Sequence, residues 1–328
     1  MKVAVVAPLL TLIALASSHV ARAETPRDEL IERARALGRR AATELTGEDA
    51  VPFVSAERER EKAKKDHPAA TFEELRVPVG DAELLTWLVS PTRGLEDRGL
   101  VVVLPGWQSN AGFALDGTGF LLAEGYRLFI VEDRAYAYTG RASEFEGFIR
   151  EAVRDVEAAL DRLAATHRLE GVPMFIYGFS WGALKALLVA ERRPELKAVI
   201  LDAPVPRPAY LARQTFMDYM PPAARDDAEL YDAFLAAFDG AVEAKLGYAP
   251  SSIDVSGAAA SIAPRPLLLI HSADDDFIPM ARVEPLFEAA REPKTFLRGE
   301  KFGHCLGMKR AKDVYIPAVL DFLKRANE

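Results

Sequence analysis

Short, almost uninterrupted apolar runs recur between residues 100 and 272, separated by stretches with helical spacing. The runs are LVVVLPG (100–106), RLFIVED (127–133), PMFIYGFS (173–180), KAVILDAP (197–204) and PLLLIHS (266–272). Such runs are typical of strands buried on both faces of a parallel sheet. Between two of them, one helix face is formed by Ile149, Val153, Val156, Leu160 and Leu163. This alternation predicts an α/β fold with a mostly parallel central sheet and helices on both faces.

Two regions depart from the alternation. FEELRVPV (72–79) and AELLTWLVS (82–90) predict two strands joined by a hairpin turn at Gly80-Asp81. Residues 204–262 have helical patterns but no buried strand, and about 60 residues are too many for a connection within a compact sheet. We therefore expect a helical cap inserted over one end of the sheet.

The cap divides the predicted core into residues 71–203 and 263–328. Residues 24–70, ahead of the core, are strongly charged and helix-prone. A partner-binding role is possible for them, but a surface helix that packs on the following domain is the better interpretation.

The first 23 residues have the pattern of a secretory signal peptide. Lys2 precedes an apolar stretch (3–16), and Ala21-Arg22-Ala23 forms an A-x-A cleavage site. We expect cleavage after Ala23 and a secreted or periplasmic protein. A retained membrane anchor is the alternative, but the apolar run is short for a span of about 20 residues. Stable membrane insertion of the remaining chain is therefore not expected.

The net charge and the cysteine and histidine content exclude several kinds of partner and site. The net charge is −8, and it becomes −10 without residues 1–23, which carry two basic residues and no acid. A chain this acidic, without a basic stripe, is not expected to bind nucleic acid. Cys305 is the only cysteine, so an internal disulfide is excluded. No Cys/His spacing indicates a metal site, and we expect no metal or cofactor.

The most informative motif is Gly178-Phe179-Ser180-Trp181-Gly182, a G-x-S-x-G sequence between an apolar strand and an amphipathic helix. This is the context in which the motif presents a nucleophilic serine on a sharp turn. The two glycines remove side chains that would collide in such a turn. The alternative is a serine that only caps the helix.

A nucleophilic serine needs a base and an acid that orients the base. Among the histidines after residue 23, only His304 lies in a loop between a late strand and the final helix. Three adjacent acids, Asp274, Asp275 and Asp276, follow the strand that ends at residue 272. They cannot all face one imidazole. A calcium site is the competing interpretation of these acids, but the ligand spacing does not match one.

The loop after the first buried strand, VVVLPGWQSN (101–110), can supply one N–H group to an oxyanion hole. Gly106 permits the turn, and we expect the backbone amide of Trp107 to face Ser180. The second amide is that of Trp181, the residue after the serine. The side chains of Gln108 and Asn110 are secondary candidates.

Together these residues resemble the α/β-hydrolase superfamily, from about residue 72 to the C-terminus. The resemblance is carried by the Pro-Gly-Trp loop, the serine turn, the acid loop and the Gly-His pair before the final helix. The family's acid loop usually reads His-Gly-x-x-Asp-x-x-Val-Pro. Aligned with it, HSADDDFIP (271–279) implies that Asp275 is the acid. One departure is Pro105-Gly106, where the family often has His-Gly.

The resemblance implies a serine hydrolase that acts through Ser180, His304 and Asp275, and the signal-peptide pattern predicts that it is secreted. The aromatic residues expected around the serine favour carboxylic esters as its substrates. The expected partner is a small-molecule ester. Candidate residues of the substrate pocket are Gln108, Phe113, Tyr136, Met217, Tyr219 and Phe277. Two other functions stay open: a small serine peptidase or aminopeptidase of the same superfamily, and a non-catalytic binding protein on a hydrolase fold. Cys305 is expected to be a packing thiol, and the oligomeric state is left open.

Overall fold

The computed structural model describes residues 25–46, 56–80, 82–91, 94–107, 109–133 and 148–328. The predicted signal peptide (1–23) lies outside the described residues, and so do two pocket candidates, Gln108 and Tyr136. Among the described residues, no helix is both long enough and apolar enough to cross a membrane.

An eight-stranded sheet forms the centre of the molecule, with the strand order β1-β2-β4-β3-β5-β6-β7-β8. The strands are β1 (Thr71–Val79), β2 (Ala82–Ser90), β3 (Gly99–Leu104), β4 (Tyr126–Val131), β5 (Met174–Phe179), β6 (Leu196–Asp202), β7 (Leu267–Ser272) and β8 (Lys294–Gly299). The first two strands pair antiparallel, as does β2 with β4, and all later pairs are parallel. The predicted mostly parallel sheet is therefore confirmed.

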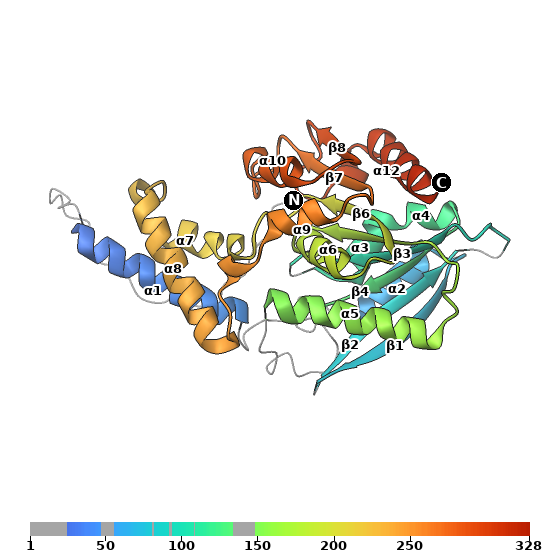
Figure 1. The fold of residues 1–328 in the computed structure, drawn as a ribbon, viewed down its shortest axis with the longest axis horizontal. Coiled ribbons are helices and arrows are strands. Elements are labelled where there is room, and N and C mark those ends of the chain that lie inside the picture. Colours follow the sequence, from blue (N-terminus) through green and yellow to red (C-terminus); the bar gives the residue numbers. More distant parts are fainter. Residues whose placement is uncertain (1–24, 47–55, 81, 92–93, 108, 134–147) are drawn as a thin grey trace.

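Helices cover both faces of the sheet (Figure 1). The α-helices among the described residues are α1 (Arg27–Thr46), α2 (Ala56–Asp66), α3 (Ala111–Thr118), α4 (Phe120–Ala123), α5 (Ile149–Thr166), α6 (Trp181–Arg192), α7 (Arg213–Tyr219), α8 (Ala228–Leu246), α9 (Val255–Ser261), α10 (Met280–Ala289), α11 (Gly307–Arg310) and α12 (Lys312–Asn327). Alternate residues of β3 point to opposite faces. Leu100 and Val102 pack in the cluster that includes α5 and α6, whereas Val101 and Val103 pack with α3, α4 and α12. This double coverage explains why the strands are apolar throughout.

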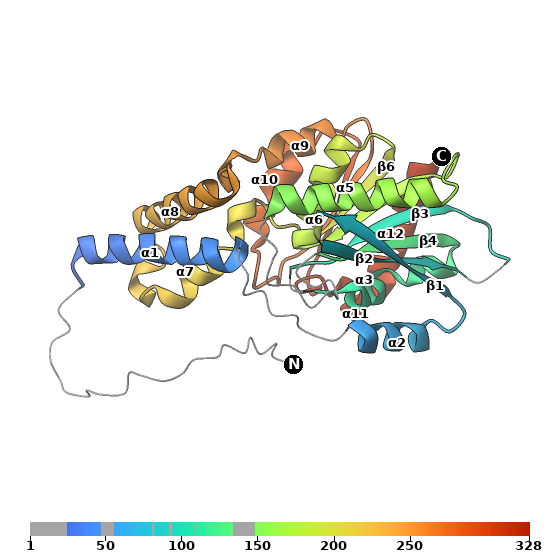
Figure 2. The same cartoon turned by 90° about the horizontal axis from the view of Figure 1, so that it is seen from below.

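The inserted segment after β6 folds as helices, with α7 and α8 extending to one side of the sheet (Figure 1). α1 lies along α8 in both views (Figures 1 and 2). Its apolar stripe of Ala34, Leu37 and Ala41 is buried, and a Cβ on Gly38 would lie 2.2 Å from the carbonyl oxygen of Phe234. The N-terminal helix expected on the following domain thus packs mainly on the cap, while α2 packs on α3.

Ion pairs tie the beginning of α1 to the beginning of α8. Arg27 bonds to Asp227 and to Glu229, the latter at 2.5 Å. Because all three side chains are substantially exposed, these pairs add little stability, and the close helix–helix contact carries most of it.

Candidate active site

Ser180 occupies a sharp turn between β5 and α6. Its backbone has φ 52° and ψ −112°, a left-handed conformation that is strained for a residue with a Cβ. A Cβ on Gly178 would lie 2.1 Å from the carbonyl oxygen of Gly182, and one on Gly182 would lie 2.2 Å from that of Leu104. Only glycine fits at either position, so the two motif glycines permit the turn that raises Ser180 above the sheet.

The structure brings together the three side chains that the sequence proposed as a triad. Ser180 Oγ lies 2.9 Å from His304 Nε2, and His304 Nδ1 lies 2.8 Å from Asp275 Oδ2. Ser180 follows β5, Asp275 follows β7 and His304 follows β8, so the carboxyl ends of three parallel strands supply them. This geometry allows a serine hydroxyl to pass its proton to an imidazole that a carboxylate orients.

Asp275 is held as an ionised carboxylate. Burial acts to raise its pKa, but the hydrogen bond from His304 and that from the backbone N–H of Ile278 outweigh burial and lower the pKa. Its second oxygen accepts from the backbone N–H groups of Phe277 and Ile278, at 2.9 Å each. Both carboxylate oxygens of Asp275 thus accept hydrogen bonds, which hold the carboxylate in one orientation.

The neighbouring acids differ from Asp275 in position. Asp274 accepts from the backbone N–H of Gly303 at 2.8 Å and so ties the acid loop to the loop that carries the histidine. Asp276 is exposed. The resemblance singled out Asp275, and of these three residues it is the one whose carboxylate contacts His304.

His271 is close to the triad but has a different role. It is buried, and its Nε2–H donates to the carbonyl oxygen of Ile278 at 2.8 Å. Burial lowers its pKa, which favours the neutral imidazole. Its Nε2 lies 3.8 Å from Asp275, so it supports the acid loop and does not contact Ser180.

The loop after β3 lies against the serine turn. A Cβ on Gly106 would lie 3.4 Å from Cβ of Ser180, and the rings of Trp107 and Trp181 meet edge to face at 5.7 Å. Within the described part of the chain, the backbone N–H groups of both tryptophans donate to no carbonyl oxygen. Asn110 instead caps α3, where its side chain accepts from the N–H of Phe113 at 3.0 Å.

The pocket candidates do not form one group. The ring of Phe277 lies edge to face with that of His304 at 5.1 Å, whereas Phe113 packs on Phe179. Met217 packs on the core cluster. Tyr219 is 41% exposed and its hydroxyl accepts from Arg40 of α1. Tyr219 therefore lies in the contact between the cap and α1.

Nothing in the sequence singled out Phe148, whose ring lies 5.1 Å from that of Trp181. A buried polar network beneath the serine turn was not predicted either. The carbonyl oxygen of Asp202 accepts from the N–H of Ser180 at 2.8 Å, and its carboxyl accepts from the Tyr315 hydroxyl, which in turn bonds to that of Tyr177. Burial raises the pKa of Asp202 to about 7. In the sequence, this network was indicated only by the position of Asp202, an acid at the end of an apolar strand.

Cys305 adjoins this network and contacts the carbonyl oxygen of Asp202 through Sγ, at 3.7 Å. Burial raises the pKa of its thiol well above the usual value. A neutral thiol is a poor nucleophile, in agreement with the packing role expected for it.

Among the described residues, no group of three or more His, Cys, Asp or Glu side chains is arranged to hold a metal ion.

The chain is similar to known proteins in sequence and in fold. A family model described as serine aminopeptidase, S33, matches residues 96–226. The structure of an α/β hydrolase, GrgF from Penicillium sp. sh18, superposes with a TM-score of 0.56 at 18% identity, over 78% of this chain and 98% of that one. This chain has the α/β-hydrolase fold.

Esterases of this fold are similar to the chain over most of its length. The Pyrococcus furiosus esterase Pf2001 superposes with a TM-score of 0.60 at 22% identity, covering 80% of this chain and 93% of that one. Est1E from Butyrivibrio proteoclasticus, in a structure with bound ferulic acid, has a TM-score of 0.58 at 15% identity over 77% and 98%. An uncharacterised protein of Bacillus subtilis, YqkD, is 25% identical over 232 residues, 70% of this chain and 72% of its own length.

Proposed function

We propose that the protein is a serine hydrolase that cleaves carboxylic esters through an acyl-enzyme intermediate. The observation that carries the proposal is the pair of hydrogen bonds, 2.9 and 2.8 Å, that links Ser180 to His304 and His304 to Asp275. The serine stands on a strained turn that the two motif glycines permit, and such turns expose a nucleophile.

In the proposed reaction the Ser180 hydroxyl attacks the acyl carbon of the ester while His304 Nε2 accepts its proton. Asp275, held ionised, stabilises the imidazolium through Nδ1. The backbone N–H groups of Trp107 and Trp181 donate to the oxyanion. His304 then returns the proton to the departing alkoxide. Water, activated by the same imidazole, releases the carboxylic acid and restores the serine.

Esters are the favoured substrates because two of the superposed structures are esterases. The matched family model supports a second candidate, an aminopeptidase. Both reactions use the same nucleophile and base, so the residues of the triad do not separate them.

The test compares p-nitrophenyl esters of graded acyl length with amino-acid p-nitroanilides. Ser180→Ala is expected to lower kcat on the order of 10⁶-fold. Asp275→Asn is expected to cost on the order of 10⁴-fold, because the imidazole loses its orienting acceptor. Ser261→Ala, which changes a serine at the end of α9, is the matched control and is expected to retain full activity.

Turnover of anilides without ester turnover would favour the aminopeptidase. Full ester hydrolysis by Ser180→Ala would overturn the mechanism. If neither substrate class is turned over, a fluorophosphonate distinguishes an unreactive binding protein from a selective enzyme. Covalent labelling that is lost in Ser180→Ala indicates the enzyme.

We also propose that the protein is exported, on the signal-peptide pattern of residues 1–23. N-terminal sequencing of protein recovered from the periplasm or the culture medium tests this. A first residue of Glu24 is the expected result.

A further inference from the structure

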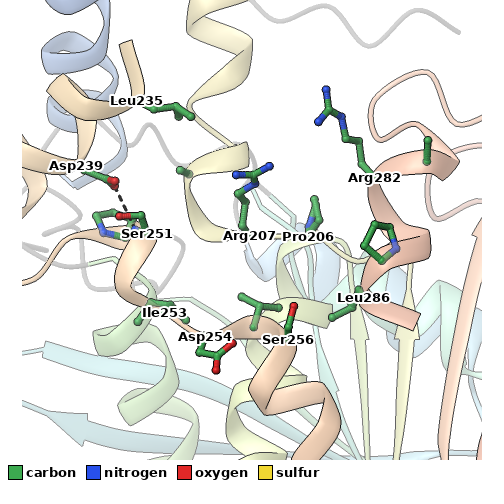
Figure 3. Close-up of a pocket in the computed structure, with 15 residues that line it drawn as sticks. Pro206, Arg207, Leu235, Asp239, Ser251, Ile253, Asp254, Ser256, Arg282 and Leu286 are labelled. Carbon is green, nitrogen blue, oxygen red and sulfur yellow. Dashed lines mark hydrogen bonds between the residues drawn. The ribbon is translucent and has the colours of Figure 1, made fainter. Parts of the chain in front are cut away.

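A cavity of about 380 Å³ lies between the cap and the core (Figure 3). Its walls include Arg207 from the segment after β6, Leu235 from α8 and Arg282 from α10. None of the three triad residues lines it. Its volume falls within the range of small-molecule sites, which is about 300–1,000 Å³.

The two arginines that line the cavity, Arg207 and Arg282, have no anionic partner among the described residues. Both are exposed, and across the described ranges of the chain neither makes an ion pair or a hydrogen bond. A third cation, Arg213, lies 5.9 Å from the ring of Tyr210. Burial raises the pKa of Tyr231, while Arg207, Arg213 and Arg282 each act to lower it. All three arginines thus add positive charge on the side of the cap that carries Tyr231.

Two acids also line the cavity, but each has an oxygen engaged by the backbone. Asp239 accepts from the N–H of Ser251 at 3.2 Å, and Asp254 caps α9 by accepting from the N–H of Gly257 at 2.8 Å. In Figure 3 the Asp254 carboxylate points away from both guanidinium groups, and Asp239 points toward Ser251. The positive charge of the arginines is thus left without a bonded counter-charge.

Two like charges on the wall of one cavity oppose one another, and an anion bound between them relieves that repulsion. A guanidinium group binds carboxylate or phosphate through two parallel N–H donors. The remaining wall is largely apolar, with Leu235, Ile253 and Leu286 among its residues. Such a wall suits a ligand with a hydrocarbon body better than an inorganic ion.

We propose that this cavity is a binding site for a small organic anion, a carboxylate or a phosphate monoester that carries an apolar group. The guanidinium groups of Arg207 and Arg282 bind the anionic end, and the apolar wall contacts the body. Because cap and core both contribute to the walls, a bound anion bridges them and stabilises the folded protein.

The test is isothermal titration calorimetry of the full chain with benzoate and with phenyl phosphate, and with benzamide as the neutral analogue. We expect saturable binding of at least one anion at one site per chain, and none of benzamide. Arg207→Gln and Arg282→Gln should each weaken that binding by about tenfold or more. Arg291→Gln, which changes an exposed arginine just beyond α10, is the matched control and should bind as the wild type does.

Binding of benzoate alone identifies a carboxylate site, and binding of phenyl phosphate alone identifies a phosphate-ester site. The proposal is overturned if neither anion binds, if benzamide binds equally well, or if the double variant of Arg207 and Arg282 still binds. Because neither side chain has a partner in the part of the chain that the structure describes, the variants should melt at the wild-type temperature. The anion should raise the melting temperature of the wild type and not that of the double variant.

The result is independent of the proposed esterase function. Ser180→Ala should bind the anion with unchanged affinity, since Ser180 does not line the cavity. Loss of binding in Ser180→Ala, with binding retained in Arg207→Gln and Arg282→Gln, would place the anion at the triad and overturn the proposal.

Discussion

The buried carboxyl of Asp202 contributes a stability that falls as pH rises, and one substitution can remove this dependence on pH. The side chain is 4% exposed, and burial raises its pKa from 3.8 to about 7. Between about pH 4 and pH 7 the folded state therefore keeps a proton that the unfolded state has lost. Where the folded state binds more protons, the free energy of unfolding falls as pH rises. A shift of about three pKa units corresponds to a loss of at most about 4 kcal/mol across this window.

Asp202→Asn removes the titration and keeps an oxygen that can accept from the Tyr315 hydroxyl. We expect the free energy of unfolding, measured with urea, to fall more between pH 5 and pH 8 in the wild type than in the variant. The quantity to compare is the difference between the two pH values, because the buried amide adds a cost of its own at both.

Tyr315→Phe is the companion variant. The Tyr315 hydroxyl acts to lower the pKa of Asp202, so its removal should raise that pKa and move the pH-dependent loss to higher pH. Parallel pH profiles for the wild type and Asp202→Asn would show that Asp202 does not titrate in this window, and the reasoning would be refuted.

Three further perturbations probe close packing and a buried ion pair. Gly182→Ala places a Cβ 2.2 Å from a backbone carbonyl of β3 and should cost about 3 kcal/mol in urea unfolding; wild-type stability would contradict this. Lys185 is fully buried and bonded to Asp133, whose side chain is 16% exposed. Asp133→Asn should therefore cost more, about 3–5 kcal/mol, than Lys185→Met, and the reverse order would refute the argument. Gly38→Ala should loosen α1 from α8 and speed amide hydrogen exchange in both, whereas Gly240→Ala, with open space around it, should not.

Much of the fold could be predicted from local patterns. The continuous apolar runs predict the buried strands, because a strand with no polar face is stable only where both of its faces are covered. The serine turn was also predictable from local sequence. The two glycines around Ser180 indicate a place where the backbone passes too close to other backbone for a Cβ to fit. These features depend on neighbours in the sequence.

Features that depend on distant contacts could not be predicted in this way. Nothing near Asp202 indicates that its carboxyl meets Tyr315, which is 113 positions later. The acids Asp274 and Asp275 are adjacent, and the path of the loop alone decides which one faces the histidine. Tyr219 has the character of a pocket residue, but the direction of its helix places it against α1.

The pairing of α1 with α8 has a consequence for how the chain folds during synthesis. Arg27 and its partner Asp227 are 200 positions apart, so α1 leaves the ribosome long before the helix that covers it. Contacts at such separation form late and slow folding. Until α8 emerges, the apolar stripe of Ala34, Leu37 and Ala41 is exposed on the nascent chain. The contact between α1 and the cap therefore forms only after α8 has emerged, and a chain arrested before α8 exposes an apolar surface that favours aggregation.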